Sequence, residues 1–132
     1  MIGLDANVIV RLFVDDDPQQ VRSARRLVAE KCSPDNPGFI DRVALCELIW
    51  VLASVHGYAR GAIADVVEKL VASRDMRLED HELVRFALRD YRAGNVDFAD
   101  VLIGHVNRAR GCEGTATFDR KAARLKGFIR IS

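Results

Sequence analysis

The residues of this chain that could do chemistry are carboxylates placed beside short apolar runs. Asp97 and Asp100 stand three residues apart at the front of the otherwise apolar NVDFADVLIGHV. Asp5 directly follows the apolar MIGL, and Asp119 follows TATF in the same way. Glu47 lies inside VALCELIWVLASV, where an ionised carboxylate among leucines is costly unless a cation or hydrogen bonds accompany it. These five acids are therefore the candidates for a functional site.

A set of carboxylates without histidine or cysteine beside it favours Mg²⁺ or Mn²⁺ over zinc. These ions prefer oxygen ligands and keep several waters, which a substrate phosphate can displace. Such a site is suited to phosphodiester hydrolysis, in which one ion polarises the phosphoryl oxygen and generates hydroxide, and a second would stabilise the leaving oxygen. The three histidines share no ligand spacing and are interpreted as surface or packing residues: His56, His81 and His105.

An alternation of strand-like and helical runs predicts the scaffold that positions these acids. Strands are expected at MIGLD, FI and MRLE and at both ends of GTATFDRKAARLKGFIRIS, with helices between them. Strands separated by helices imply an α/β domain with a mostly parallel sheet. With 132 residues, no internal repeat and no linker, the chain is expected to be a single domain, 1–132.

On that scaffold the acids can converge, although each has a simpler explanation. Asp5 and Asp119 would lie at the carboxyl ends of strands, the edge where open α/β sheets bind ligands, but either could merely cap the helix that follows. Asp97 and Asp100 have the spacing of an N-cap and N3 pair, which would complement a helix dipole. Glu47 could instead angle to solvent or pair with an arginine.

Four segments together carry a resemblance to a known family: IGLDANVIVRLFVDDDPQQ, ALCELIWVL, VDFADVLIGHV and GTATFDRKAARLKGF. In this order and almost from end to end, the chain resembles a PIN-domain ribonuclease, specifically a VapC-type toxin of a toxin–antitoxin pair. The resemblance implies a PIN-like three-layer α/β/α fold with a mostly parallel central sheet. It also implies an RNA substrate, Mg²⁺ or Mn²⁺ as cofactor, a cognate antitoxin protein and a homodimer.

The resemblance also assigns roles to individual positions. The metal-binding and catalytic acids would be Asp5, Glu47, Asp100 and Asp119, while Asp97 matches an extra acid of members that have the DFAD form. Two supporting residues would order the site, Asn7 in LDAN and Thr117 in TFD, which could otherwise be a helix cap and a strand-end hydroxyl. The chain departs from the family at Ala6, where threonine is common, so it lacks the hydroxyl that threonine would supply there.

Three classes of function compete. The leading hypothesis is a metal-dependent endoribonuclease held inactive by an antitoxin, and the alternative is a catalytically silent RNA- or protein-binding module with the same fold. The third class, a phosphoacceptor receiver domain, would need an acid pair after the first strand and a lysine ending a late strand, and neither is present. The retention of all four principal acids favours the enzyme.

Charge and hydropathy bear on partners and location. The net charge of +1 conceals a basic end, with seven basic residues against two acidic ones from His105 onward, which is compatible with RNA or with a solvated helical face. The longest apolar run has 13 residues, whereas a membrane span needs about 20. We therefore expect a cytoplasmic protein with no membrane segment. The three scattered cysteines argue against a disulfide framework or a zinc knuckle.

Overall fold

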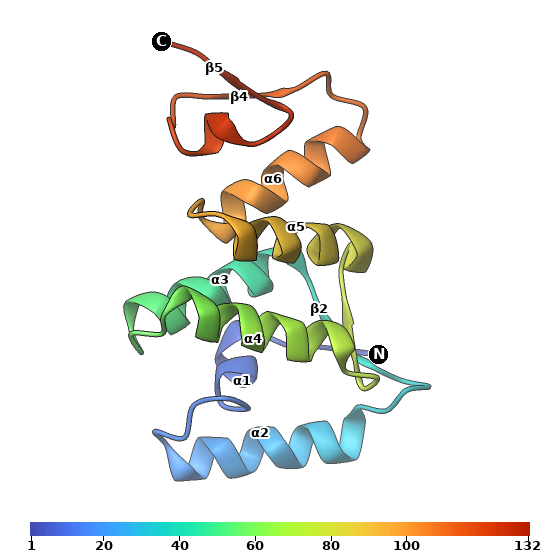
Figure 1. The fold of residues 1–132 in the computed structure, drawn as a ribbon. Coiled ribbons are helices and arrows are strands. Elements are labelled where there is room, and N and C mark those ends of the chain that lie inside the picture. The colour runs from blue at the N-terminus through green and yellow to red at the C-terminus, as the bar shows by residue number, and fades with distance from the viewer. The chain divides into compact units, whose positions relative to one another are not determined.

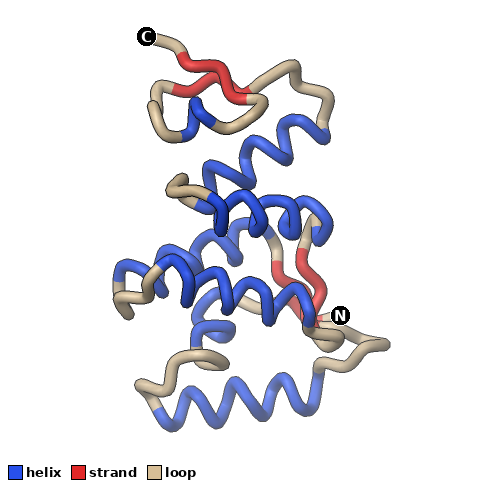
Figure 2. Tube along the Cα trace, viewed as in Figure 1, coloured by secondary structure: helices blue, strands red, loops and turns tan.

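The computed structural model describes residues 1–132, which cluster into two compact units. The first is Met1–His81 and the second is Glu82–Ser132. Figure 1 traces the chain through both, and Figure 2 shows that helices and short strands alternate along it. All strand pairings are parallel, so the α/β class and the parallel pairing predicted from the sequence are confirmed. The expectation of one domain over 1–132 stays a prediction.

The first unit is built on a three-stranded parallel sheet in the order β1-β2-β3. Its strands are β1 (Ile2–Gly3), β2 (Gly38–Ile40) and β3 (Met76–Leu78). The connections contain four helices: α1 (Ala6–Val10), α2 (Pro18–Lys31), α3 (Arg42–Ser54) and α4 (Arg60–Ala72). Helix α1 packs on α3, α3 on α4, and α4 on β3. The interior is aliphatic, with Ile9, Ile40, Leu48, Leu52 and Val67 fully buried.

Local sequence signals explain where the helices of this unit begin. Asp17 caps α2 by accepting a hydrogen bond from the Gln20 backbone N–H at 3.2 Å, and the proline that follows it suits the first helical position. Asp41 caps α3 by accepting from the Ala44 N–H at 2.7 Å. Both helices therefore start where an aspartate satisfies backbone donors that have no partner within the helix.

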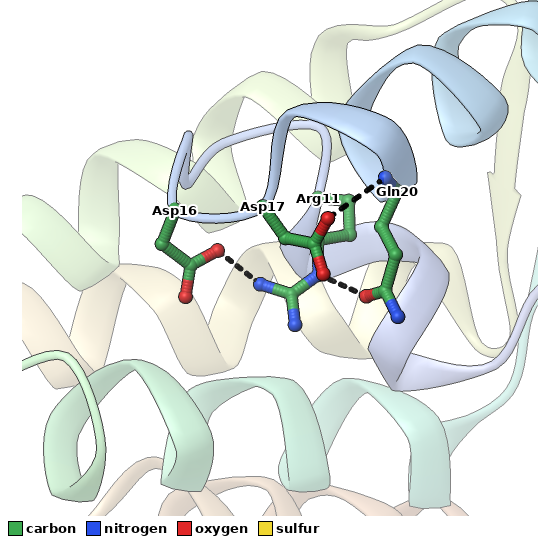
Figure 3. A network of polar contacts seen from close by, with 4 residues as sticks. All are labelled: Arg11, Asp16, Asp17 and Gln20. Atoms are coloured by element: carbon green, nitrogen blue, oxygen red, sulfur yellow. Dashed lines mark hydrogen bonds and ion pairs between the residues drawn. The ribbon is translucent and has the colours of Figure 1, made fainter.

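A polar network holds the connection between α1 and α2 (Figure 3). Arg11 donates from Nε to the Gln20 side chain at 2.8 Å and pairs with Asp16 through Nη1. One arginine at the end of α1 thus contacts both the loop before α2 and the first turn of that helix. The pairs lie at the surface, so they define the loop conformation and contribute little to overall stability.

The second unit contains two helices, a two-stranded parallel sheet and a short 3₁₀ turn. Its elements are α5 (His81–Ala93), α6 (Phe98–Ala109), β4 (Thr115–Thr117), η1 (Ala122–Arg124) and β5 (Phe128–Arg130). Helices α5 and α6 meet where the Tyr91 and Phe98 rings pack edge to face, with centroids 5.6 Å apart. Strand β5 comes so close to α6 that a β-carbon at Gly104 would collide with the Phe128 ring.

The element types and their order agree with the sequence prediction throughout. The segment DFADVLIGHVNRARG forms α6, and GTATFDRKAARLKGFIRIS forms β4, η1 and β5. The strands are only two or three residues long. No helix combines the length and the apolar character needed to cross a membrane.

Candidate active site

Two of the predicted acids of the first unit, Asp5 and Glu47, line the same pocket, together with Asp41. The pocket has a volume of about 310 Å³. Asp5 follows β1 and Asp41 follows β2, so both lie at the carboxyl ends of adjacent parallel strands, and Glu47 comes from the second turn of α3. Asp41 was not among the acids predicted from the sequence. It follows the strand FI as Asp5 follows MIGL, so the same signal could have found it.

Both strand-end aspartates in this pocket are also helix caps. Asp5 Oδ1 accepts from the Ala6 N–H at 2.7 Å, and Asp41 Oδ1 accepts from the Ala44 N–H at 2.7 Å. The simpler explanation proposed for Asp5 is therefore present in the structure. This hydrogen bond occupies one oxygen of the Asp5 carboxylate and leaves the other oxygen without a hydrogen bond. Capping and cation binding are therefore compatible for Asp5.

The expected burial of Glu47 among leucines was wrong. Its side chain is exposed, and it has no arginine partner. Leu45, Leu48 and Leu52 are buried on another face of α3, whereas the face of Glu47 also carries Trp50, which is 64% exposed. The apolar composition of α3 therefore overstated its burial, and the exposed carboxylate of Glu47 is accessible to a ligand.

In the second unit, Asp97, Asp100 and Asp119 lie close enough to interact electrostatically. Burial raises the pKa of Asp100 above its usual value, and the negative charges of Asp97 and Asp119 raise it further. Asp100 stands in the first turn of α6 and is half-buried, while the other two are exposed. A half-buried carboxylate with two negative charges beside it marks a region that a cation would stabilise.

The capping interpretation fits Asp119 but is wrong for Asp97. Asp119 Oδ1 accepts from the Lys121 N–H at 2.8 Å, which supports the turn before η1. Asp97 occupies the N-cap position of α6, yet its side chain makes no capping hydrogen bond. The carboxylate of Asp97 is therefore not used by the helix, and it remains free to interact with Asp100.

Of the two predicted supporting residues, Thr117 contacts a predicted ligand and Asn7 does not. Thr117 ends β4, and its Oγ1 accepts from the Asp119 N–H at 3.0 Å, so it orients the backbone of a predicted ligand. Asn7 is exposed on α1 and lines a separate pocket with Arg11 and Gln20, away from the pocket of Asp5 and Glu47. Ala6 is buried in the core, so the position that is often threonine is filled here by a small apolar group.

The chemistry of the donors fits a hard divalent cation. All candidate ligands are carboxylate oxygens, which Mg²⁺ and Mn²⁺ prefer, and the repulsion around Asp100 would be relieved by positive charge. No group of three histidine, cysteine, aspartate or glutamate side chains is close enough to form a metal site in the structure. Each unit therefore supplies part of the predicted ligand set: Asp5 and Glu47 in the first, and Asp97, Asp100 and Asp119 in the second.

Comparison with known proteins adds independent information. A family model described as PIN domain matches residues 2–127, a span that includes every predicted site residue. Among solved structures, the chain is similar to Mycobacterium tuberculosis VapC20, described as a Sarcin-Ricin loop cleaving toxin, with 22% identity over 93% of each chain and a TM-score of 0.45. No curated protein matches the chain. The match to the family model confirms the predicted PIN-like α/β fold class.

Proposed function

The chain belongs to the PIN domain family, and on that premise we propose that it is a metal-dependent endoribonuclease that hydrolyses RNA phosphodiester bonds. One observation carries the proposal. The acids that the sequence singled out gather within each unit, with Asp5 and Glu47 in one pocket and Asp97, Asp100 and Asp119 interacting electrostatically.

The bound ion would be Mg²⁺ or Mn²⁺, held by Asp5, Glu47, Asp100 and Asp119, with Asp97 as an additional acid. When bound, the ion supplies Lewis-acid activation of the phosphodiester and of water. The protein's part is to hold the carboxylates in place. Thr117 does this for Asp119 by fixing its backbone, and Ala6 does it for Asp5 by donating its N–H. Asp97, free of any capping bond, adds negative charge beside Asp100.

We further propose that the protein is the toxin of a type II toxin–antitoxin pair, a homodimer whose cognate antitoxin blocks the site. The motif resemblance over most of the chain supports this role. Helix α3 supports a protein partner, because Val43 and Trp50 are 75% and 64% exposed and lie on the same face as Glu47. Large exposed apolar side chains of this kind mark interaction surfaces when they cluster. A partner bound there would also cover a proposed ligand of the ion.

A cleavage assay tests the enzymatic proposal. The purified chain, free of antitoxin, should cleave single-stranded RNA with Mg²⁺ or Mn²⁺, and Asp100→Asn should abolish cleavage while leaving the circular dichroism spectrum unchanged. Asp35→Asn is a matched control, because it removes one exposed aspartate charge from a loop outside the proposed site. Undiminished cleavage in excess EDTA would refute the proposed metal dependence. RNA binding without cleavage in the presence of any metal would favour the catalytically silent binding module.

A further inference from the structure

A second pocket lies wholly within the second unit, and none of the proposed metal-binding acids lines it. Its volume is about 360 Å³, within the usual range for pockets that bind small molecules or parts of larger ligands. Helix α5 contributes Arg89 and Asp90, α6 contributes His105 and Arg108, and the segment from η1 to β5 contributes Arg124 and Lys126. Segments distant in the sequence therefore meet around a strongly basic cavity.

The charges lining this pocket are not balanced by carboxylates of the protein. Asp90 is the only acid that lines it, and its Oδ2 lies 2.7 Å from His105 Nε2. Arg124 and Lys126 are exposed, and neither side chain has an ion pair or hydrogen bond. Their positive charges therefore remain available to an anion from outside the protein, and the planar guanidinium of Arg124 suits a phosphate.

One arginine of the pocket, Arg108, has a structural role. Its Nη2 donates to the Lys126 carbonyl oxygen at 2.9 Å, and the guanidinium packs closely against Gly127. A side chain on α6 thus holds the turn before β5 in place. That interaction positions Lys126 at the pocket even though Lys126 itself is on a loop.

An aromatic platform borders the basic pocket. The Phe86 side chain is 41% exposed, and its ring stacks on His105 with centroids 6.1 Å apart and planes inclined by 27°. Arg89 places its guanidinium carbon 5.3 Å from the centre of the Phe86 ring. Because Asp90 holds His105 by a hydrogen bond, the ring next to Phe86 is itself fixed. An exposed aromatic beside free cations is the combination by which proteins hold single-stranded nucleic acids.

We propose that this pocket is a single-stranded RNA subsite, separate from the acids, in which Arg124 and Lys126 bind a backbone phosphate and Phe86 stacks on a neighbouring base. The inference rests on the proposed ribonuclease function and adds to it a place where the substrate is held outside the reacting centre. Stacking is tolerant of sequence, because every base has a π-face. The subsite therefore contributes affinity and not sequence specificity.

Binding measured without metal tests the subsite independently of cleavage. The anisotropy of a fluorescent single-stranded RNA oligonucleotide would be followed with the full-length chain in EDTA over a range of salt concentrations. The double variant Arg124→Gln/Lys126→Gln should bind all RNA sequences more weakly. The slope of log affinity against log salt should also become shallower, by roughly 0.7 for each phosphate that the variant no longer neutralises. Phe86→Leu should weaken binding about tenfold with little change in the salt slope.

A matched control separates a specific subsite from general electrostatics. Arg25→Gln/Lys31→Gln also removes one arginine and one lysine charge, from exposed positions on α2. It should leave affinity and salt slope unchanged, and equally weakened binding in this control would overturn the proposal, as would unaltered binding in the pocket variants. Thermal melts check folding, and Lys126→Gln alone replaces the double variant if that variant is unstable.

Two further outcomes separate a free nucleotide from RNA as the ligand, and a failure of the subsite from a failure of the ribonuclease proposal. If uridine monophosphate displaces the oligonucleotide at concentrations similar to those of the oligonucleotide itself, the pocket is a free-nucleotide site and the RNA proposal is overturned. If the chain binds RNA through this pocket but cleaves none with Mg²⁺ or Mn²⁺, the subsite stands and the ribonuclease proposal fails.

Discussion

Replacing Asp100 by asparagine should change the melting temperature in opposite directions with and without metal. In the metal-free protein, burial and the charges of Asp97 and Asp119 disfavour the ionised form of Asp100. The isosteric amide removes that unfavourable charge, so Asp100→Asn should melt at a higher temperature than the wild type in EDTA. The same change removes a proposed metal ligand, so the variant should gain less stability when Mn²⁺ is added.

The size of the metal response follows from mass action and the length of the chain. An ion that binds only the folded state stabilises it by about 2.7 kcal/mol when present at 100 times its dissociation constant. An unfolding entropy of about 2.1 cal/mol/K for each of the 132 residues gives roughly 0.28 kcal/mol/K for the whole chain. The wild-type melting temperature should therefore rise by about 10 °C, and that of Asp100→Asn by clearly less.

Differential scanning fluorimetry of both proteins in EDTA and through a Mn²⁺ titration measures the two effects. Asp35→Asn serves again as the control, because it removes an exposed aspartate without touching either group of acids, and it should respond to metal as the wild type does. A metal response that is unchanged by Asp100→Asn would refute the assignment of Asp100 as a ligand. A lower metal-free melting temperature for the variant would show that Asp100 mainly serves the dipole of α6.

The remaining predictions concern pH, packing and association. Because the pKa of Asp100 is raised in the folded protein, the stability associated with its proton is complete below the ordinary aspartate pKa and is lost as pH rises through the raised value. In EDTA, the difference in melting temperature between Asp100→Asn and the wild type should therefore vanish below about pH 4. Gly104→Ala should destabilise the protein by roughly 1–3 kcal/mol in urea titrations, since the added methyl group meets the Phe128 ring; an unchanged midpoint would show that β5 can shift away from α6. Trp50→Ser should weaken binding of the cognate antitoxin in sedimentation experiments with helical content preserved, because the indole is exposed on the α3 face proposed for that partner, and unaltered binding would place the antitoxin elsewhere.

Local chemistry accounts for what could be read from the sequence. The proline after Asp17 and the apolar spacing that follows it predict α2, and the structure begins that helix at Pro18 with Asp17 as its cap. The alternation of strands and helices predicts parallel pairing because a crossover helix returns the chain in the same direction. Asp5 was likewise placed at a strand end from the four apolar residues before it. Each of these inferences depends on neighbours within one or two turns of the chain.

Only tertiary packing decided which faces of the elements are covered and which side chains meet. The apolar composition of α3 suggested a buried Glu47, but periodicity cannot say that its neighbours leave the face of Val43, Glu47 and Trp50 exposed. Asp97 occupies the predicted N-cap position of α6 but makes no capping hydrogen bond, and sequence spacing alone does not fix a side-chain rotamer.

The basic pocket of the second unit most clearly separates what the sequence predicts from what tertiary packing decides. Its residues come from α5, α6 and the segment from η1 to β5, and the sequence offered only a surplus of arginine and lysine near the end of the chain. A solvated helical face and a phosphate site have the same composition. They differ in whether cations from distant segments converge without carboxylate partners, as Arg124 and Lys126 do beside Arg89. That convergence is set by packing of α5 and β5 against α6, which no spacing within the sequence encodes.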